Sequence, residues 1–130
     1  VSVEFPAGSA FDAADKPGVS AMTNGLMRLG AKGLAEDEIE RRLADTGAVL
    51  GNRFDTDRSG LTLRTLSDPR WRNEALQLMT QVLAAPEYPQ TVLERERSRL
   101  LASLKESERL PATLASREFQ RAVFGDHPYG

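Results

Sequence analysis

Two strand-like segments joined by a short turn constrain the fold of this chain most strongly. Residues 48–55 (AVLGNRFD) and 60–66 (GLTLRTL) read as strands, and the TDRSG between them suits a hairpin turn. Leu61 and Leu63 mark one face of the second strand, as expected when only that face is buried. The pattern therefore predicts an antiparallel hairpin.

The other predicted elements lie before and after this hairpin along the chain. Residues 1–5 (VSVEF) alternate apolar and polar side chains, which predicts a further strand. Apolar residues that recur every three or four positions predict five helices, at residues 18–30, 35–46, within 67–86, 89–109 and 112–124. The order is strand, two helices, two strands, then helices. It predicts an α+β fold in which helices cover one face of an antiparallel sheet.

Glycine and proline set the expected helix boundaries. Gly30 is expected to end the first helix and Gly47 the second. Pro69 suits the first position of the third helix, behind Ser67 or Asp68 as a cap. The apolar side of this third helix consists of Trp71, Ala75, Leu78, Met79 and Val82.

Composition excludes several classes of function. The 130 residues carry 17 basic and 19 acidic side chains, mixed along the chain, so no basic block favours nucleic acid. There is no cysteine, which excludes disulfides and thiolate chemistry and fits either a cytoplasm or a bacterial periplasm, so the localisation stays open. No apolar run is long enough to span a membrane. The chain starts abruptly at Val1, and we expect residues 1–130 to be the N-terminal portion of one domain whose C-terminal part is missing.

A catalytic set is not visible from the residues alone. His127 is the only histidine, so no pair of imidazoles one helical turn apart can bind zinc. Its neighbours in DHPYG predict a turn near the surface. No GxSxG motif or phosphate-binding glycine loop is present. A carboxylate pair of glycosidase type stays open, although the acidic residues cluster on predicted solvent faces.

The whole chain nevertheless resembles the pitrilysin family of zinc metallopeptidases, also called inverzincins. The phrases VEFPAGSAFDAADKPGVSAMTNGLMRLGAKG and AEDEIERRLADTGAVLGNRFDTDRSGLTLRTL follow the family's first strand, first two helices and strand pair. The stretch from WRNEALQ to DHPYG resembles the helices that follow. Each phrase alone is weak evidence for the family. Together the phrases occur in the family's order and spacing across all 130 residues, which makes the resemblance strong.

The resemblance also implies where a zinc site would be. Active members carry HxxEH on the first helix, and counting from Gly18 places its two histidines at Ala21 and Gly25 and its glutamate at Asn24. A third ligand, a glutamate on a later helix, falls at Ser103 when Glu96 and Arg97 are aligned with the family's Glu-Arg pair. A slip of one residue would place it at Ala102 or Leu104 instead.

These residues cannot perform the family's chemistry. Ala21 and Gly25 offer no donor atom to a metal, and the Asn24 amide cannot accept a proton from zinc-bound water near neutral pH. We therefore expect no catalytic residue, no metal and no cofactor on this chain, with zinc only in an active partner domain.

Three hypotheses about function remain, of which the first two follow from the resemblance. The first is a non-catalytic half or subunit of a pitrilysin-type peptidase, which helps to enclose and bind unfolded peptide for an active, HxxEH-bearing partner in the same or another chain. The second is a degenerate homologue with a purely structural or assembly role, as in the bc1 core proteins. The third is an unrelated enzyme that uses acidic residues. None of these hypotheses includes a nucleic acid partner or a membrane-spanning segment within residues 1–130.

Overall fold

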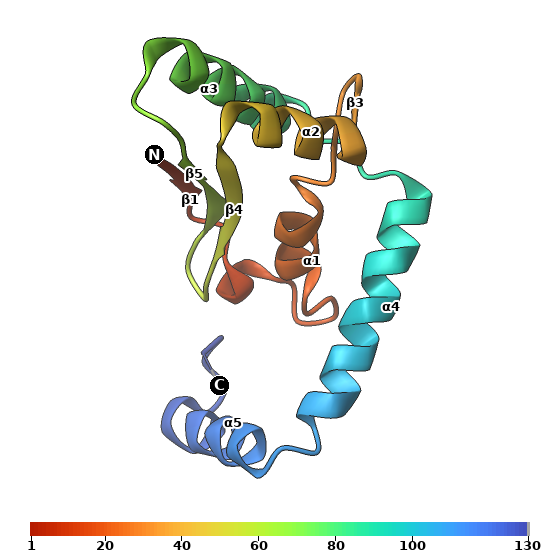
Figure 1. Cartoon of the computed structure of the whole chain (residues 1–130). Coiled ribbons are helices and arrows are strands. Elements are labelled where there is room, and N and C mark those ends of the chain that lie inside the picture. Colours follow the sequence, from red (N-terminus) through yellow and green to blue (C-terminus); the bar gives the residue numbers. More distant parts are fainter. Residues whose placement is uncertain (130) are drawn as a thin grey trace.

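A computed structural model describes residues 1–129, and its centre is a three-stranded antiparallel sheet (Figure 1). The strands β1 (Ser2–Phe5), β4 (Val49–Phe54) and β5 (Ser59–Arg64) lie in the order β1-β5-β4. The predicted hairpin between β4 and β5 is confirmed. Its turn is held by Asp55, whose Oδ1 accepts hydrogen bonds from the backbone N–H groups of Asp57 and Arg58 at 2.9 and 2.8 Å.

Helices cover one face of this sheet, which confirms the predicted α+β class. A short 3-10 turn, η1 (Ser9–Phe11), precedes the first helix, and a two-stranded sheet of β2 (Gly30–Ala31) and β3 (Leu34–Ala35) follows it. The helices are α1 (Val19–Leu26), α2 (Glu36–Thr46), α3 (Pro69–Ala84), α4 (Gln90–Ser107) and α5 (Pro111–Phe124). No described helix combines the length and apolarity that a membrane span requires.

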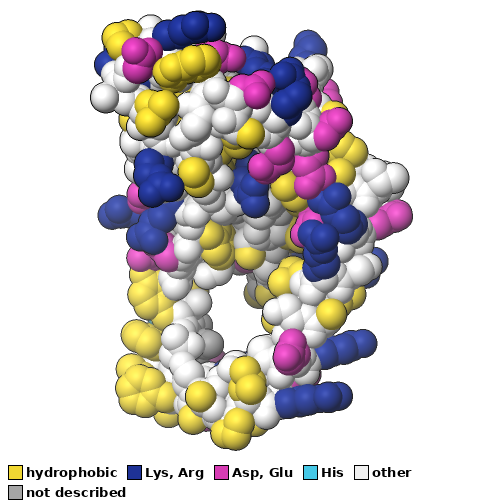
Figure 2. All heavy atoms as spheres, viewed as in Figure 1, with side chains coloured by type: hydrophobic (Ala, Val, Ile, Leu, Met, Phe, Trp, Pro, Cys, Tyr) yellow, Lys and Arg dark blue, Asp and Glu magenta, His cyan; other side chains and the backbone are white. Residues whose placement is uncertain are grey.

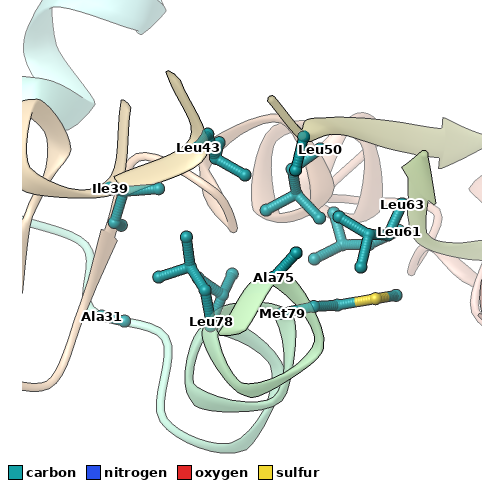
Figure 3. Close-up of a cluster of buried hydrophobic side chains, with 11 residues drawn as sticks. Ala31, Ile39, Leu43, Leu50, Leu61, Leu63, Ala75, Leu78 and Met79 are labelled. Carbon is teal, nitrogen blue, oxygen red and sulfur yellow. The ribbon is translucent and has the colours of Figure 1, made fainter. Parts of the chain in front are cut away.

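The core lies where α2 and α3 pack against each other and against β4 and β5 (Figure 3). Ile39 of α2, Leu61 of β5 and Leu78 of α3 are almost completely buried. Burying such a side chain stabilises the fold by about 1.5–3 kcal/mol. The cluster is made by Ala31, Ile39, Leu43, Ala48, Leu50, Leu61, Leu63, Ala75, Leu78, Met79 and Val82.

Local chemistry explains two of the predicted boundaries. Pro69 opens α3, where a missing N–H costs nothing, and Asp68 Oδ1 accepts from the N–H of Arg70 at 2.9 Å. Gly47 ends α2 with a left-handed φ of 62°, which glycine adopts without strain. Asp68 is thus the cap of α3, and the role predicted for Gly47 is confirmed.

The predicted role of Gly30 was wrong. Helix α1 ends at Leu26, and Gly30 instead belongs to β2, where its carbonyl accepts from the N–H of Glu87 at 3.0 Å. A Cβ at Gly30 would stand 2.9 Å from the carbonyl oxygen of Glu87. This glycine therefore permits a close backbone approach, a long-range contact that no local pattern reveals.

Trp71 also differs from its predicted place on the buried side of α3. This residue is only partly buried, and the guanidinium carbon of Arg70 lies 4.5 Å from the ring centroid. The tryptophan sits in the first turn of α3, before the first buried residue of this helix, Ala75. The other four residues predicted on this side are all buried.

The last two helices form an arm that leaves the rest of the molecule. Neither α4 nor α5 contains a buried residue, and Figure 2 shows an opening between the arm and the body of the protein. After the arm, the chain contacts the body again through Tyr129, whose hydroxyl donates a hydrogen bond to Asp57 Oδ1. This bond raises the pKa of Tyr129. Large apolar side chains exposed on the arm are Leu100, Leu101, Leu104, Leu110, Leu114, Phe119, Val123 and Phe124.

Candidate functional site

Helix α1 is held in place at its first turn by Asp12. The Asp12 carboxylate accepts from the backbone N–H of Ser20 at 2.9 Å and of Gly18 at 2.7 Å, which are groups that a helix leaves without partners at its start. These hydrogen bonds lower the pKa of Asp12 below its ordinary value, and the bond from Ser20 has the largest effect. The helix on which the resemblance places the degenerate HxxEH positions is therefore fixed by a carboxylate from the preceding loop.

Asn24 ties the same helix to the sheet. Its side chain is 1% exposed, and Nδ2 donates to Ser59 Oγ at 3.0 Å and to the Gly60 carbonyl at 2.9 Å. Asn52 of β4 donates in turn to the backbone carbonyl of Asn24. Both protons of the amide are thus donated to acceptors on β5. Asn24 does not line the pocket described next.

The other three predicted positions meet at one pocket between α1 and α4. Ala21 and Gly25 of α1 and Ser103 of α4 all line a volume of about 330 Å³, whereas Ala102 and Leu104 do not. A Cβ built at Gly25 would have no neighbour within 4 Å. The lining consists of Ala21, Met22, Gly25, Leu26, Glu96, Arg99, Leu100 and Ser103.

Glu96 also lines this pocket, although its only predicted role was to match the Glu-Arg pair of the family. Its Oε1 accepts from Arg95 Nε at 2.7 Å and from an Arg99 guanidinium nitrogen at 2.9 Å, while Oε2 accepts no hydrogen bond among the described residues. Arg95 also donates hydrogen bonds to Glu36 of α2. The carboxylates of Glu96 and Glu36 raise the pKa of Arg95, and Glu96 has the larger effect. Glu96 lies two helical turns before Ser103, and this spacing on one helix face could have revealed its place.

This set of side chains does not fit a zinc ion. Zinc sites in proteins use three or four nitrogen, sulfur or carboxylate ligands. The pocket offers one carboxylate, already bonded to two arginines, and one hydroxyl. Across residues 1–129, no three side chains of His, Cys, Asp or Glu are grouped so as to bind a metal.

His127 lies elsewhere, in the turn that follows α5. It is exposed, as predicted, and its Nδ1 accepts from the backbone N–H of Tyr129 at 3.3 Å. The two aromatic rings meet edge to face, with their centroids 4.8 Å apart. His127 is not among the residues that line the pocket between α1 and α4.

Comparison with protein families matches residues 1–130 to Insulinase (Peptidase family M16). The chain belongs to peptidase family M16. This confirms the family and the fold that the resemblance implied. No curated protein sequence matches this M16 chain significantly.

A solved structure of the same family is very similar. The crystal structure of a peptidase M16 inactive domain from Pseudomonas fluorescens superposes with a TM-score of 0.91 and is 33% identical in sequence. The match covers 97% of this M16 chain and 30% of the Pseudomonas chain. The chain thus spans about 30% of the length of that relative.

Proposed function

We propose that this chain is a non-catalytic half or subunit of a family M16 zinc metallopeptidase, which helps to enclose and bind peptide substrate for an active, HxxEH-bearing partner. The observation that carries the proposal is the convergence of Ala21, Gly25 and Ser103 on one pocket. These are the three positions where the family resemblance places zinc ligands, and none of their side chains is an imidazole or a carboxylate.

The fourth position supports the same conclusion. A catalytic base needs a proton-accepting group that is free to reach the reacting water. Asn24 carries an amide, and its Nδ2 is committed to Ser59 and Gly60 on β5. The similarity to an inactive domain of family M16 provides independent support.

The choice between Ser103 and its neighbours also has a structural basis. Ser103 lines the pocket together with Ala21 and Gly25, and Ala102 and Leu104 lie outside its lining. We therefore assign the degenerate third ligand position to Ser103 and propose no metal or cofactor on this chain.

A peptidase assay tests the proposed role. The purified chain, an HxxEH-bearing M16 protein encoded in the same genome, and their mixture are each incubated with a quenched fluorescent peptide and zinc. We expect no hydrolysis by the chain alone and at least a tenfold higher rate for the mixture than for the partner alone. Hydrolysis by the chain alone would overturn the proposal.

The same mixture separates this role from the alternative of a purely structural homologue. A subunit that helps to bind substrate changes the KM of the partner for peptides, because it forms part of the substrate-binding surface. If the chain binds the partner and leaves both kcat and KM unchanged, the structural role is correct and the proposed one is wrong.

A further inference from the structure

The pocket between α1 and α4 has the dimensions and the walls of a ligand site. Its volume of about 330 Å³ lies within the range of pockets that bind small molecules or side chains. Met22 and Leu26 of α1 and Leu100 of α4 provide large apolar walls. The small residues at positions 21 and 25 leave the space between these walls open.

The polar groups at this pocket determine what it can accept. Among residues 1–129, Glu96 Oε2 accepts no hydrogen bond, because both arginine contacts of this carboxylate are made to Oε1. The guanidinium of Arg99 balances the charge of Glu96, so the pocket does not attract a free cation. The carboxylate likewise disfavours an anion. The complementary guest is apolar and carries a neutral N–H donor.

We infer that this pocket binds one large apolar side chain of an extended peptide, whose backbone N–H donates to Glu96 Oε2. A peptide combines an apolar side chain and an N–H donor within one residue, which matches the apolar walls and the acceptor beside them. The inference rests on the proposed function, since it names the part of the peptide that this domain holds. The space that a zinc centre would fill becomes a subsite for substrate.

Peptide titrations followed by NMR of the whole protein test this subsite. The probes are two nine-residue peptides of glycine and serine that differ only in a central leucine or alanine. The leucine peptide should shift the backbone amide signals of Gly25 and Ser103, and the alanine peptide should bind roughly tenfold or more weakly, because it buries less apolar surface. Equal binding of both peptides, or shifts confined to another surface, would overturn the inference.

Two further measurements test the geometry. Gly25→Leu should fill the pocket and weaken leucine-peptide binding about tenfold or more. Thr23→Leu is the matched control, because Thr23 is exposed on the same helix and does not line this pocket, so its affinity should be unchanged. Thermal melting confirms that both variants are folded. Loss of binding in the control, or none in Gly25→Leu, would contradict the assignment.

N-methylation of the leucine residue in the peptide removes the proposed donor without altering the protein. It should weaken binding about threefold to tenfold, the worth of one hydrogen bond. An unchanged affinity would exclude the bond to Glu96. Zinc content and peptide hydrolysis are measured on the same samples: zinc-dependent cleavage would refute the proposed function, whereas failure of the titrations alone refutes only the subsite.

Discussion

Asn24, which the family resemblance aligns with a catalytic position, has a structural role in this fold. The family resemblance aligns it with a glutamate base, yet the structure buries its amide against β5, where Nδ2 donates to Ser59 and Gly60. A buried polar group is costly unless it is hydrogen-bonded, and here both amide protons have partners. At this position the chain uses hydrogen bonding to fix α1 on the sheet.

Replacing this amide should therefore destabilise the fold. Asn24→Ala leaves the buried Gly60 carbonyl and the Ser59 hydroxyl without their donor, and we expect a loss of about 2–3 kcal/mol in the free energy of unfolding. Urea denaturation measures it. Thr23→Ala, an exposed neighbour on α1, is the control and should change the stability by less than about 0.5 kcal/mol. Equal effects of the two substitutions would show that the hydrogen bonds of Asn24 contribute nothing.

Asp12 gives the start of α1 a dependence on pH. Its pKa is lowered in the folded protein by the N–H groups of Ser20 and Gly18, so the unfolded chain holds the proton more tightly. The stabilisation is complete above about pH 4, the ordinary pKa of an aspartate, and is lost as pH falls through the lower folded value. Asp12→Asn should thus unfold at a lower temperature than wild type at pH 7. The difference between the two melting temperatures should shrink towards pH 2. A difference that is independent of pH would contradict this account.

At the scale of elements, β5 joins the parts of the fold that are distant in sequence. It pairs with β1 on one side and β4 on the other, and its Gly60 lies directly against the first strand. A Cβ at Gly60 would collide with the carbonyl oxygen of Val3 and the Cα of Glu4. These are backbone atoms, which cannot rotate away.

Gly60→Ala should consequently separate β1 from β5. We expect a destabilisation of about 1–3 kcal/mol from the steric conflict, together with faster hydrogen exchange of the β1 amides. Gly51→Ala is a suitable comparison on β4, since its Cβ would approach only the Thr62 hydroxyl, a side chain that can move, at 3.0 Å. If Gly51→Ala perturbs β1 as strongly as Gly60→Ala, the close approach of the two backbones is not the cause.

Elements with strong local signals could be predicted from the sequence, and contacts between distant segments could not. The hairpin, the start of α3 at Pro69 and the end of α2 at Gly47 follow from turn and cap residues. The hydrogen bond between Gly30 and Glu87 joins backbone atoms far apart along the chain, and α1 ends at Leu26, four residues before the predicted boundary. The family resemblance singled out Ala21, Gly25 and Ser103, and the structure brings these three residues to one pocket. The hydrogen bonds of the Asn24 amide to β5 depend on contacts between distant segments, which the sequence does not reveal.

For the whole molecule, the decisive feature is the way α1 lies between the sheet and α4 (Figure 1). This arrangement brings Gly25 and Ser103, which are far apart in sequence, to a single pocket. If these positions correspond to the ligands of active relatives, suitable side chains placed there should bind zinc. Asn24 can stay unchanged in such a variant, because a metal ligand set does not require the base.

Zinc titration by calorimetry of wild type and of the triple variant Ala21→His, Gly25→His, Ser103→Glu tests this correspondence most directly. The wild-type protein should bind no stoichiometric zinc, and the triple variant should bind one equivalent, because two imidazoles and a carboxylate form a zinc-binding set. A control with Ala102→Glu in place of Ser103→Glu should bind more weakly, since Ala102 does not line the pocket. One tightly bound zinc in the wild-type protein, or none in the triple variant, would contradict the account.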